Sequence, residues 1–208
     1  MNRALLLVAL VGCGGEYAFH DPDVVPPAEP PGFDRDEFGA PPDWDDCYGG
    51  LRGIYANLTV DHPDVEPPEG AEPPGDPLAL DWWDDVAFER YDPTLDFGAR
   101  WYPVDEGLAG DPDYFAVRWL GWLRVSSHTN LQMVLGSADD AWILVDGDVV
   151  VARPGVRDFE PEAISVPVPT GQHPFEIRYA HRSGDSGFRF RVTGGDVAIC
   201  HPVYTSDD

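Results

Sequence analysis

Residues 114–125 read YFAVRWLGWLRV, in which apolar and polar side chains alternate with a period of two. The side chains at odd positions, from Phe115 to Val125, would lie together on one side of an extended strand, and Arg118, Trp122 and Arg124 on the other. This stretch therefore predicts a long strand with one buried face and one face toward water.

The same period recurs elsewhere in the chain. It predicts further strands at residues 51–59, 131–135, 175–180, 188–192 and 198–204. Residues 141–152 read as two strands about Asp146-Gly147, a dipeptide favoured in two-residue hairpin turns because both positions tolerate a positive φ. The 22 Pro and 22 Gly break long helices and suit short strands joined by turns. The pattern predicts an all-β fold, an antiparallel two-sheet β-sandwich.

The overall charge narrows the class of partner. The 208 residues include 38 acidic and 13 basic side chains, a net charge of -25, and the chain contains no Lys. A nucleic-acid partner is excluded, because affinity for a phosphate backbone comes mainly from clustered cationic side chains. With 43% apolar residues, including 7 Trp and 10 Phe, the chain is too hydrophobic for an acidic disordered protein.

The first residues have the pattern of an export signal. A short positive start is followed by an apolar run at residues 4–11, far shorter than the roughly 20 residues of a membrane-spanning helix. Leu10-Val11-Gly12-Cys13 resembles the lipobox of bacterial lipoproteins, which implies a signal peptide at 1–12, lipidation of Cys13, and a place in the cell envelope at the outer membrane. Contact with the membrane would then be through the lipid only. The alternative is an ordinary signal peptide that contains a Cys.

Two acidic, Pro-rich stretches interrupt the apolar pattern. The first, within 13–46, is expected to be an extended tether, since it offers too little apolar surface to fold. The second, 61–81, is expected to be a long surface loop of a single folded domain at 47–204, which is followed by a short tail at 205–208. Both are predicted to be solvated spacers.

Two cysteines remain if Cys13 carries lipid. Cys47 and Cys200 flank the predicted domain and would lie in a compartment that permits disulfides, so they can form one bridge. The alternative is a pair of buried free thiols.

Four segments resemble, in order and spacing, strands of the PA14 domain, a β-sandwich module of bacterial toxins, glycosidases and yeast adhesins. These segments are Gly50–Tyr55, Phe115–Leu123, Leu135–Gly147 and Gly171–Tyr179. The resemblance covers about residues 49–193. It implies the same sandwich and a binding role.

The resemblance also implies a metal site. In lectin-like PA14 domains the pair that matches Asp139 and Asp140 is joined by a cis peptide and binds Ca²⁺, which coordinates sugar hydroxyls. Further ligands come from a loop that matches residues 181–186, where Asp185 is the candidate oxygen ligand in place of the usual Asn. Arg182 would repel the ion if it pointed inward. The alternative is that the two acids form a turn between strands.

Ligand contacts are expected near this pair, from Arg182, Ser183 and Trp142. Trp119 falls on the predicted inward face and is expected in the core. Trp122 and the pair Trp82-Trp83 are either packing residues or platforms for sugar rings.

No catalytic motif is present, and the six His lack metal-ligand spacing, so we expect no enzyme. The sequence predicts a lipid-anchored cell-envelope module that binds a glycan or another cell-surface ligand, with Ca²⁺ as the candidate cofactor. The alternative is a metal-independent structural or protein-interaction module.

Overall fold

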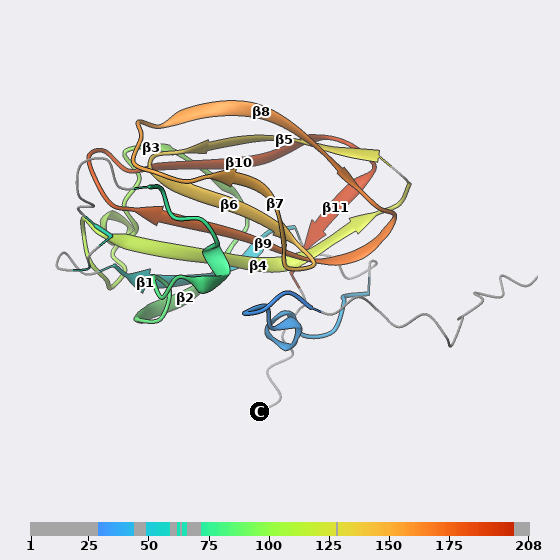
Figure 1. Cartoon of the computed structure of the whole chain (residues 1–208), viewed down its shortest axis with the longest axis horizontal. Helices are drawn as coiled ribbons and strands as arrows, with labels where there is room; N and C mark the ends of the chain where they lie inside the picture. Colours follow the sequence, from blue (N-terminus) through green and yellow to red (C-terminus); the bar gives the residue numbers. More distant parts are fainter. Residues whose placement is uncertain are drawn as a thin grey trace, which may run out of the picture.

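The computed structural model describes residues 29–43, 49–58, 62, 64–65, 72–127 and 129–201. Within these residues all regular structure is strand or short 3-10 helix, and the strands form two antiparallel sheets. The larger sheet has the order β2-β1-β4-β9-β6-β7, with β11 paired to the end of β4, and the smaller has the order β3-β10-β5-β8. The sheets stack face to face (Figure 1). The predicted antiparallel β-sandwich is confirmed.

The strand bounds are β1 Leu51–Asn57, β2 Val86–Asp92, β3 Leu95–Ala99, β4 Phe115–Val125, β5 Thr129–Ser137, β6 Asp140–Val145, β7 Asp148–Arg153, β8 Glu160–Val168, β9 Gly171–His181, β10 Gly187–Gly194 and β11 Val197–Cys200. The 3-10 helices are η1 Arg35–Phe38, η3 Pro77–Ala79 and η4 Pro103–Glu106.

The core lies between the two sheets and is built by the alternation that the sequence predicts. Trp119 on β4 is fully buried and its ring stacks on Phe188 of β10 in the opposite sheet, with 4.6 Å between ring centroids. The Asp92 carboxylate lies in this core, where it accepts hydrogen bonds from Tyr55 Oη (2.6 Å) and Trp119 Nε1 (2.8 Å). These bonds satisfy a group that would otherwise be costly to bury.

The predicted Asp146-Gly147 hairpin joins β6 to β7. Asp146 has a φ of 52° and Gly147 a φ of 81°, so both central residues are left-handed, as the favoured two-residue hairpin turn requires. Three strands have no counterpart in the sequence prediction: β2, β3 and β8. β8 is an edge strand whose first half is exposed, and its apolar alternation is limited to Ile164, Val166 and Val168. Pro161 and Pro167, which cannot donate to a ladder, argue against a strand at this place in the sequence.

The outer face of the larger sheet is covered at one end by residues 29–43, so the prediction that 13–46 is an extended tether is wrong for this part. Phe38 in η1 is buried, and Trp122 Nε1 of β4 donates a hydrogen bond to its carbonyl oxygen (3.0 Å). Glu37 accepts a hydrogen bond from the Arg118 guanidinium (2.5 Å). The segment, blue in Figure 1, docks because its aromatic side chains find apolar partners on the strands, although its net composition is acidic.

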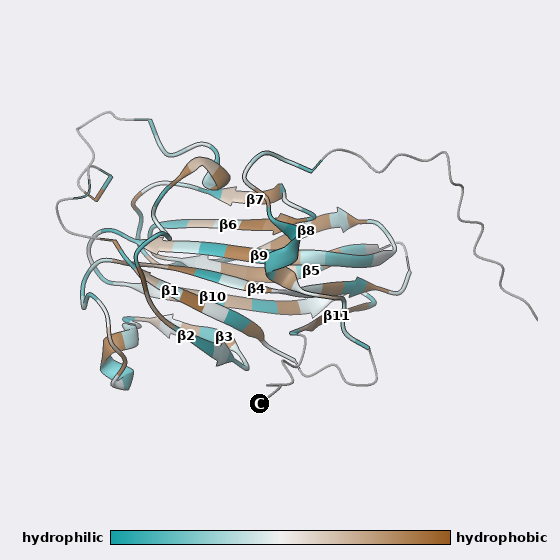
Figure 2. Ribbon diagram, turned by 90° about the horizontal axis from the view of Figure 1, so that it is seen from below, coloured by the Kyte–Doolittle hydropathy of each residue, from teal (hydrophilic) through white to brown (hydrophobic). Residues whose placement is uncertain are grey.

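The other end of this face is covered by the described part of the acidic 61–81 stretch and the residues after it. The described part of this stretch forms no strand, and Val65 in it packs on the sheet. Val65, Trp82 and Trp83 are buried against Trp142 of β6. Figure 2, which looks at this face, shows hydrophobic residues interspersed with hydrophilic ones along its strands. The face that was expected to meet water is therefore largely buried.

Several predictions concern residues outside the described part of the chain: the signal peptide at 1–12, lipidation of Cys13, and the tail at 205–208. Cys47 also lies outside it, while Cys200 is fully buried at the end of β11, so the bridge between them stays a prediction. None of the described residues forms a helix that is long and apolar enough to cross a membrane.

Candidate functional site

The Asp139-Asp140 pair lies where the chain passes from one sheet to the other. Three of the connections that cross between the sheets meet here: β5 to β6 at residues 138–139, β7 to β8 at 154–159, and β9 to β10 at 182–186. Asp139 has a φ of 66°, a left-handed conformation that Asp tolerates better than most residues and that turns the chain sharply into β6.

Asp139 joins all three connections. Its Oδ1 accepts a hydrogen bond from the Arg157 backbone N–H (3.1 Å), and its Oδ2 accepts from the backbone N–H groups of Arg182 (2.6 Å) and Ser183 (2.8 Å). The His181 ring lies beside the same oxygen, with Nδ1 at 3.2 Å from Oδ2. The carboxylate is fully buried. Its donors are mostly main-chain groups held in place by the three connections.

Asp140 is bound to a cation that the protein itself supplies. Its Oδ2 accepts a hydrogen bond from Arg182 Nε (2.6 Å), and its Oδ1 accepts one from the Gly155 backbone N–H. Arg182 is 2% exposed, so its side chain points inward and forms a buried ion pair with Asp140. The same guanidinium donates through Nη1 to the Asp64 carbonyl oxygen (2.6 Å).

The two carboxyl groups respond differently to their surroundings. Burial raises the pKa of Asp140 above its ordinary value, although Gly155 and Arg182 act in the opposite direction. Burial also acts to raise the pKa of Asp139, but the adjacent His181 ring and the backbone N–H donors outweigh it, so this pKa is lowered.

The candidate ligand residues near the pair are mostly inaccessible. Trp142 is fully buried, with the Trp82 and Trp83 rings against its own at 6.0 and 6.3 Å between centroids, so its assignment as a ligand contact is wrong. Arg182 is also buried and cannot meet a ligand. Ser183 is exposed and stays a candidate.

Trp122, Trp82 and Trp83 are packing residues rather than sugar platforms, since none is more than 5% exposed. Trp122 points outward from β4 and is covered by Phe38. Trp82 and Trp83 lie in a turn before β2 and are buried against Trp142.

The third predicted metal ligand does not join the pair. Asp185 is 67% exposed and pairs with Arg100, whose Nε lies 3.0 Å from its Oδ2. Across the part of the chain that the structure describes, no three His, Cys, Asp or Glu side chains are grouped so that they could hold a metal ion. No peptide bond in that part is cis. The assignment of Asp139, Asp140 and Asp185 to one ion is therefore wrong, and the residues present do not fit a calcium site.

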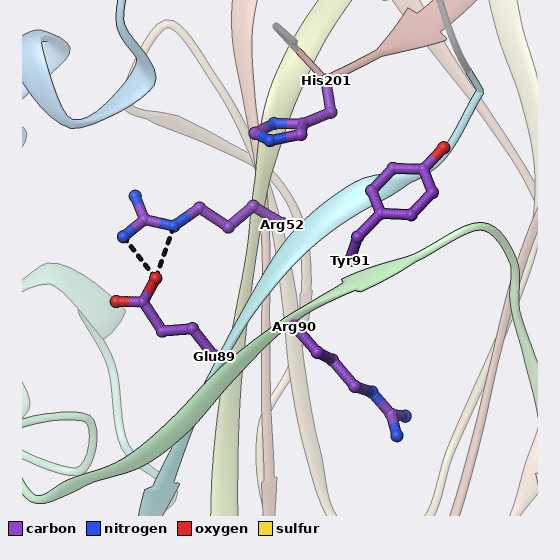
Figure 3. A pocket seen from close by; sticks show the side chains of 5 residues that line it. All are labelled: Arg52, Glu89, Arg90, Tyr91 and His201. Atoms are coloured by element: carbon purple, nitrogen blue, oxygen red, sulfur yellow. Dashed lines mark hydrogen bonds and ion pairs between the residues drawn. The ribbon is translucent and has the colours of Figure 1, made fainter. Parts of the chain in front are cut away.

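A different site lies on β1, β2 and the residue after β11. A cavity of about 390 Å³ is lined by Arg52, Glu89, Arg90, Tyr91 and His201. Figure 3 shows the Arg52 guanidinium turned toward the Glu89 carboxylate, with Nε at 2.8 Å and Nη2 at 2.6 Å from Oε2.

Two rings form the other side of this cavity. Tyr91 and His201 lie 6.1 Å apart between ring centroids with 34° between their planes. Tyr91 is 45% exposed. Burial, together with the Arg52 charge, lowers the pKa of His201, so the ring favours its neutral form. Arg90 points away from the other four side chains (Figure 3). Its Nε lies 2.6 Å from Asp92 Oδ1.

Sequence reasoning missed this cavity because its residues come from distant segments without a shared motif. The one available signal was the alternation within β2, where Glu89 and Tyr91 are two residues apart and so share a face.

Comparison with solved structures identifies the fold as PA14-like. The chain is similar to the PA14 sugar-binding domain from an RTX adhesin, with a TM-score of 0.54 and 16% identity over 74% of this chain and 98% of the other. It is also similar to the PA14 domain of the MpAFP antifreeze protein, with a TM-score of 0.53 and 14% identity over 78% and 91%. A third similar structure is the epithelial adhesin 9 A domain from Candida glabrata in complex with Galb1-3GlcNAc. Its TM-score is 0.51 and its identity 11%, over 80% of this chain and 96% of the other.

The chain spans 45% and 46% of the length of two anti-sigma factor domain-containing proteins that it also matches, one of them from Clostridium clariflavum, with a TM-score of 0.49 for each. No family model matches the sequence, and no curated protein sequence does.

Proposed function

We propose that this chain is a binding module of the bacterial cell envelope, held at the membrane by a lipid on Cys13, that recognises carbohydrate or another surface ligand. Its fold is shared with a sugar-binding domain of an RTX adhesin and with a yeast adhesin domain in complex with a disaccharide. Because so distant a likeness extends to the fold alone, the proposal depends on a site in this chain.

The observation that carries the proposal is the cavity at Arg52, Glu89, Tyr91 and His201. An Arg-Glu pair offers donors and acceptors side by side, which suits neighbouring hydroxyl groups. Aromatic rings such as that of Tyr91 offer an apolar face with a polar edge, a common feature of binding surfaces. A concave surface with a few convergent polar groups is the usual form of a small-ligand site.

The proposal is tested by screening the purified full chain, in detergent, on an array of bacterial and host glycans. We expect binding to a defined set of glycans, and we expect Tyr91→Ala to weaken it about tenfold, the loss of roughly 1.4 kcal/mol of contact. Glu89→Gln should weaken it as well. Val156→Ala, which alters an exposed apolar residue outside the cavity, is the matched control and should bind as the wild type does.

The alternative site near the acid pair is tested in the same assay by Ser183→Ala. If Ser183→Ala abolishes glycan binding while Tyr91→Ala leaves it unchanged, the ligand is bound at the β9–β10 connection and the cavity assignment is wrong. If the wild-type chain binds no glycan, the carbohydrate proposal fails and the protein-interaction function takes its place.

Lipidation has its own test, since the motif predicts that the Cys13 thiol accepts the acyl chains. The wild-type chain expressed in bacteria should partition into the detergent phase, and Cys13→Ser should move to the aqueous phase. Equal partitioning of the two proteins would contradict the anchor.

A further inference from the structure

Asp139 and Asp140 place two negative charges in the interior, at the connections between the sheets. Asp139 and Asp140 are adjacent and fully buried carboxylates, and such groups repel each other and lose their hydration unless something compensates. In a PA14 domain of the lectin type the compensation is a calcium ion, but the residues present here do not fit that ion.

Each of the four carboxylate oxygens of the pair accepts a hydrogen bond from the protein itself. Three backbone N–H groups donate to Asp139, and the Gly155 N–H and the Arg182 Nε donate to Asp140. A cation that entered would have to displace these donors. Backbone donors are fixed by the three connections and cannot rotate away as a side chain can.

The Arg182 guanidinium has further contacts besides Asp140. Its Nη1 donates to the Asp64 carbonyl oxygen, and its guanidinium lies over the Trp82 ring at 5.1 Å from the centroid. Asp64 in turn accepts a hydrogen bond from Trp82 Nε1 (2.8 Å). The charge therefore sits in a closed aromatic and carbonyl pocket, where leaving would expose a buried carboxylate.

From this geometry we infer that Arg182 is a built-in cation at the place that a metal ion would take. Its guanidinium compensates the charge of Asp140 and ties it to Asp64 and Trp82, while backbone N–H groups of the neighbouring connections stabilise Asp139. This arrangement makes the domain independent of calcium. The guanidinium stabilises the buried carboxylate as a bound ion would, but it is covalently attached to the chain and always charged. The inference does not depend on which ligand the cavity binds.

The test is a set of thermal unfolding curves of the full chain. The melting temperature of the wild type should be the same in EDTA and in millimolar calcium, because a ligand raises it only by binding the folded state. Arg182→Gln should lower it by about 10 °C, since an uncompensated charge is left buried in the pair. Arg182→Lys should recover part of the loss, because it restores the charge without the planar fork.

A double-mutant cycle separates charge pairing from lost packing. In the Arg182→Gln background, Asp140→Asn should cost much less than it does in the wild type, or should raise the melting temperature, because the unpaired charge is gone. The matched control is Arg178→Gln, which removes a buried Arg inside β9 that is paired with Glu176 at 2.7 Å, and it should show no coupling to Asp140→Asn.

Stabilisation of the wild type by calcium, or additive effects of Arg182→Gln and Asp140→Asn, would overturn the inference. If Arg182→Gln does not fold, the wild type, Arg182→Lys and Asp140→Asn still decide the inference. It requires that calcium leave the melting temperature of each of these three proteins unchanged.

Discussion

At the scale of single residues, polar groups in this domain are placed where two segments must be joined. His173 is an example: its Nδ1 lies 2.6 Å from Asp146 Oδ2 in the β6–β7 turn, and its Nε2 lies 3.0 Å from the Pro169 carbonyl oxygen. Both ring nitrogens face acceptors, so the protonated ring, which has two donors, satisfies both contacts. The Asp146 hydrogen bond raises the pKa of His173 above 6.5 despite burial, while the Arg35 charge acts to lower it.

This arrangement predicts a stability that depends on pH. A raised pKa in the folded state means that the contribution of His173 is fully present below the unfolded value of 6.5 and is lost as the pH rises through the folded value. Between about pH 5.5 and about pH 8.5, the free energy of unfolding should fall less in His173→Gln than in the wild type. Urea unfolding at several pH values measures this.

Two variants serve as controls for the pH profile. Asp146→Asn should flatten it as His173→Gln does, because it removes the acceptor that raises the pKa. His201→Gln should make the fall steeper, because the lowered pKa of His201 gives a contribution of opposite sign. A profile of His173→Gln that follows the wild type at every pH would contradict the assignment.

At the scale of elements, residues 29–43 are in close contact with the β6–β7 turn. Gly147 in this turn has a φ of 81°, and a Cβ added there would lie 2.6 Å from Phe33 Cγ. Gly184 in the β9–β10 connection has a similar φ of 71° but nothing within 4 Å of an added Cβ. Comparing an alanine substitution at each of the two glycines therefore separates the cost of backbone strain from the cost of steric contact.

We expect Gly184→Ala to cost about 1 kcal/mol through backbone strain alone, and Gly147→Ala to cost about 1 kcal/mol more than that, because Phe33 must also move. Chemical denaturation of the full chain gives both values. Phe33→Ala in the Gly147→Ala background should remove the difference. Equal costs for the two glycine variants would show that Phe33 does not press on the turn.

The docking of η1 can be tested through Phe38, which is buried with Ile54, Leu120 and Trp122. Phe38→Ala should lower the free energy of unfolding by about 3 kcal/mol, since it empties an aromatic site in an apolar cluster. Val156→Ala, at a position that is 51% exposed, should change it by less than about 0.5 kcal/mol. If Phe38→Ala costs no more than Val156→Ala, residues 29–43 form a loose tether after all.

At the scale of the whole molecule, the sandwich was predictable because local alternation and the Asp-Gly turn encode strands directly. The docking of 29–43 was not, because a run of acids and prolines indicates disorder unless the partner of Phe38 is known. The inward direction of Arg182 was equally hidden: the sequence places it near the acid pair, but only the meeting of three sheet crossings decides which way it points. The cavity at Arg52 and Tyr91 depends on pairings between segments far apart in the chain.

The docked segment also alters how the domain would be held at a membrane. If Cys13 carries lipid, only residues 14–28 remain between the anchor and the docked segment, which is at most about 50 Å of fully extended chain. The proposed module would then act close to the bilayer that anchors it rather than at the end of a longer tether.

The central claim is that the acid pair is closed by a side chain of the protein and not by a metal. The most direct measurement is a crystal structure of the full chain grown in calcium chloride. The account predicts Arg182 Nε at hydrogen-bond distance from Asp140 Oδ2, near 2.6 Å, with backbone N–H groups on both oxygens of Asp139. A calcium ion about 2.3 to 2.6 Å from oxygens of both carboxylates, with Arg182 turned outward, would contradict it.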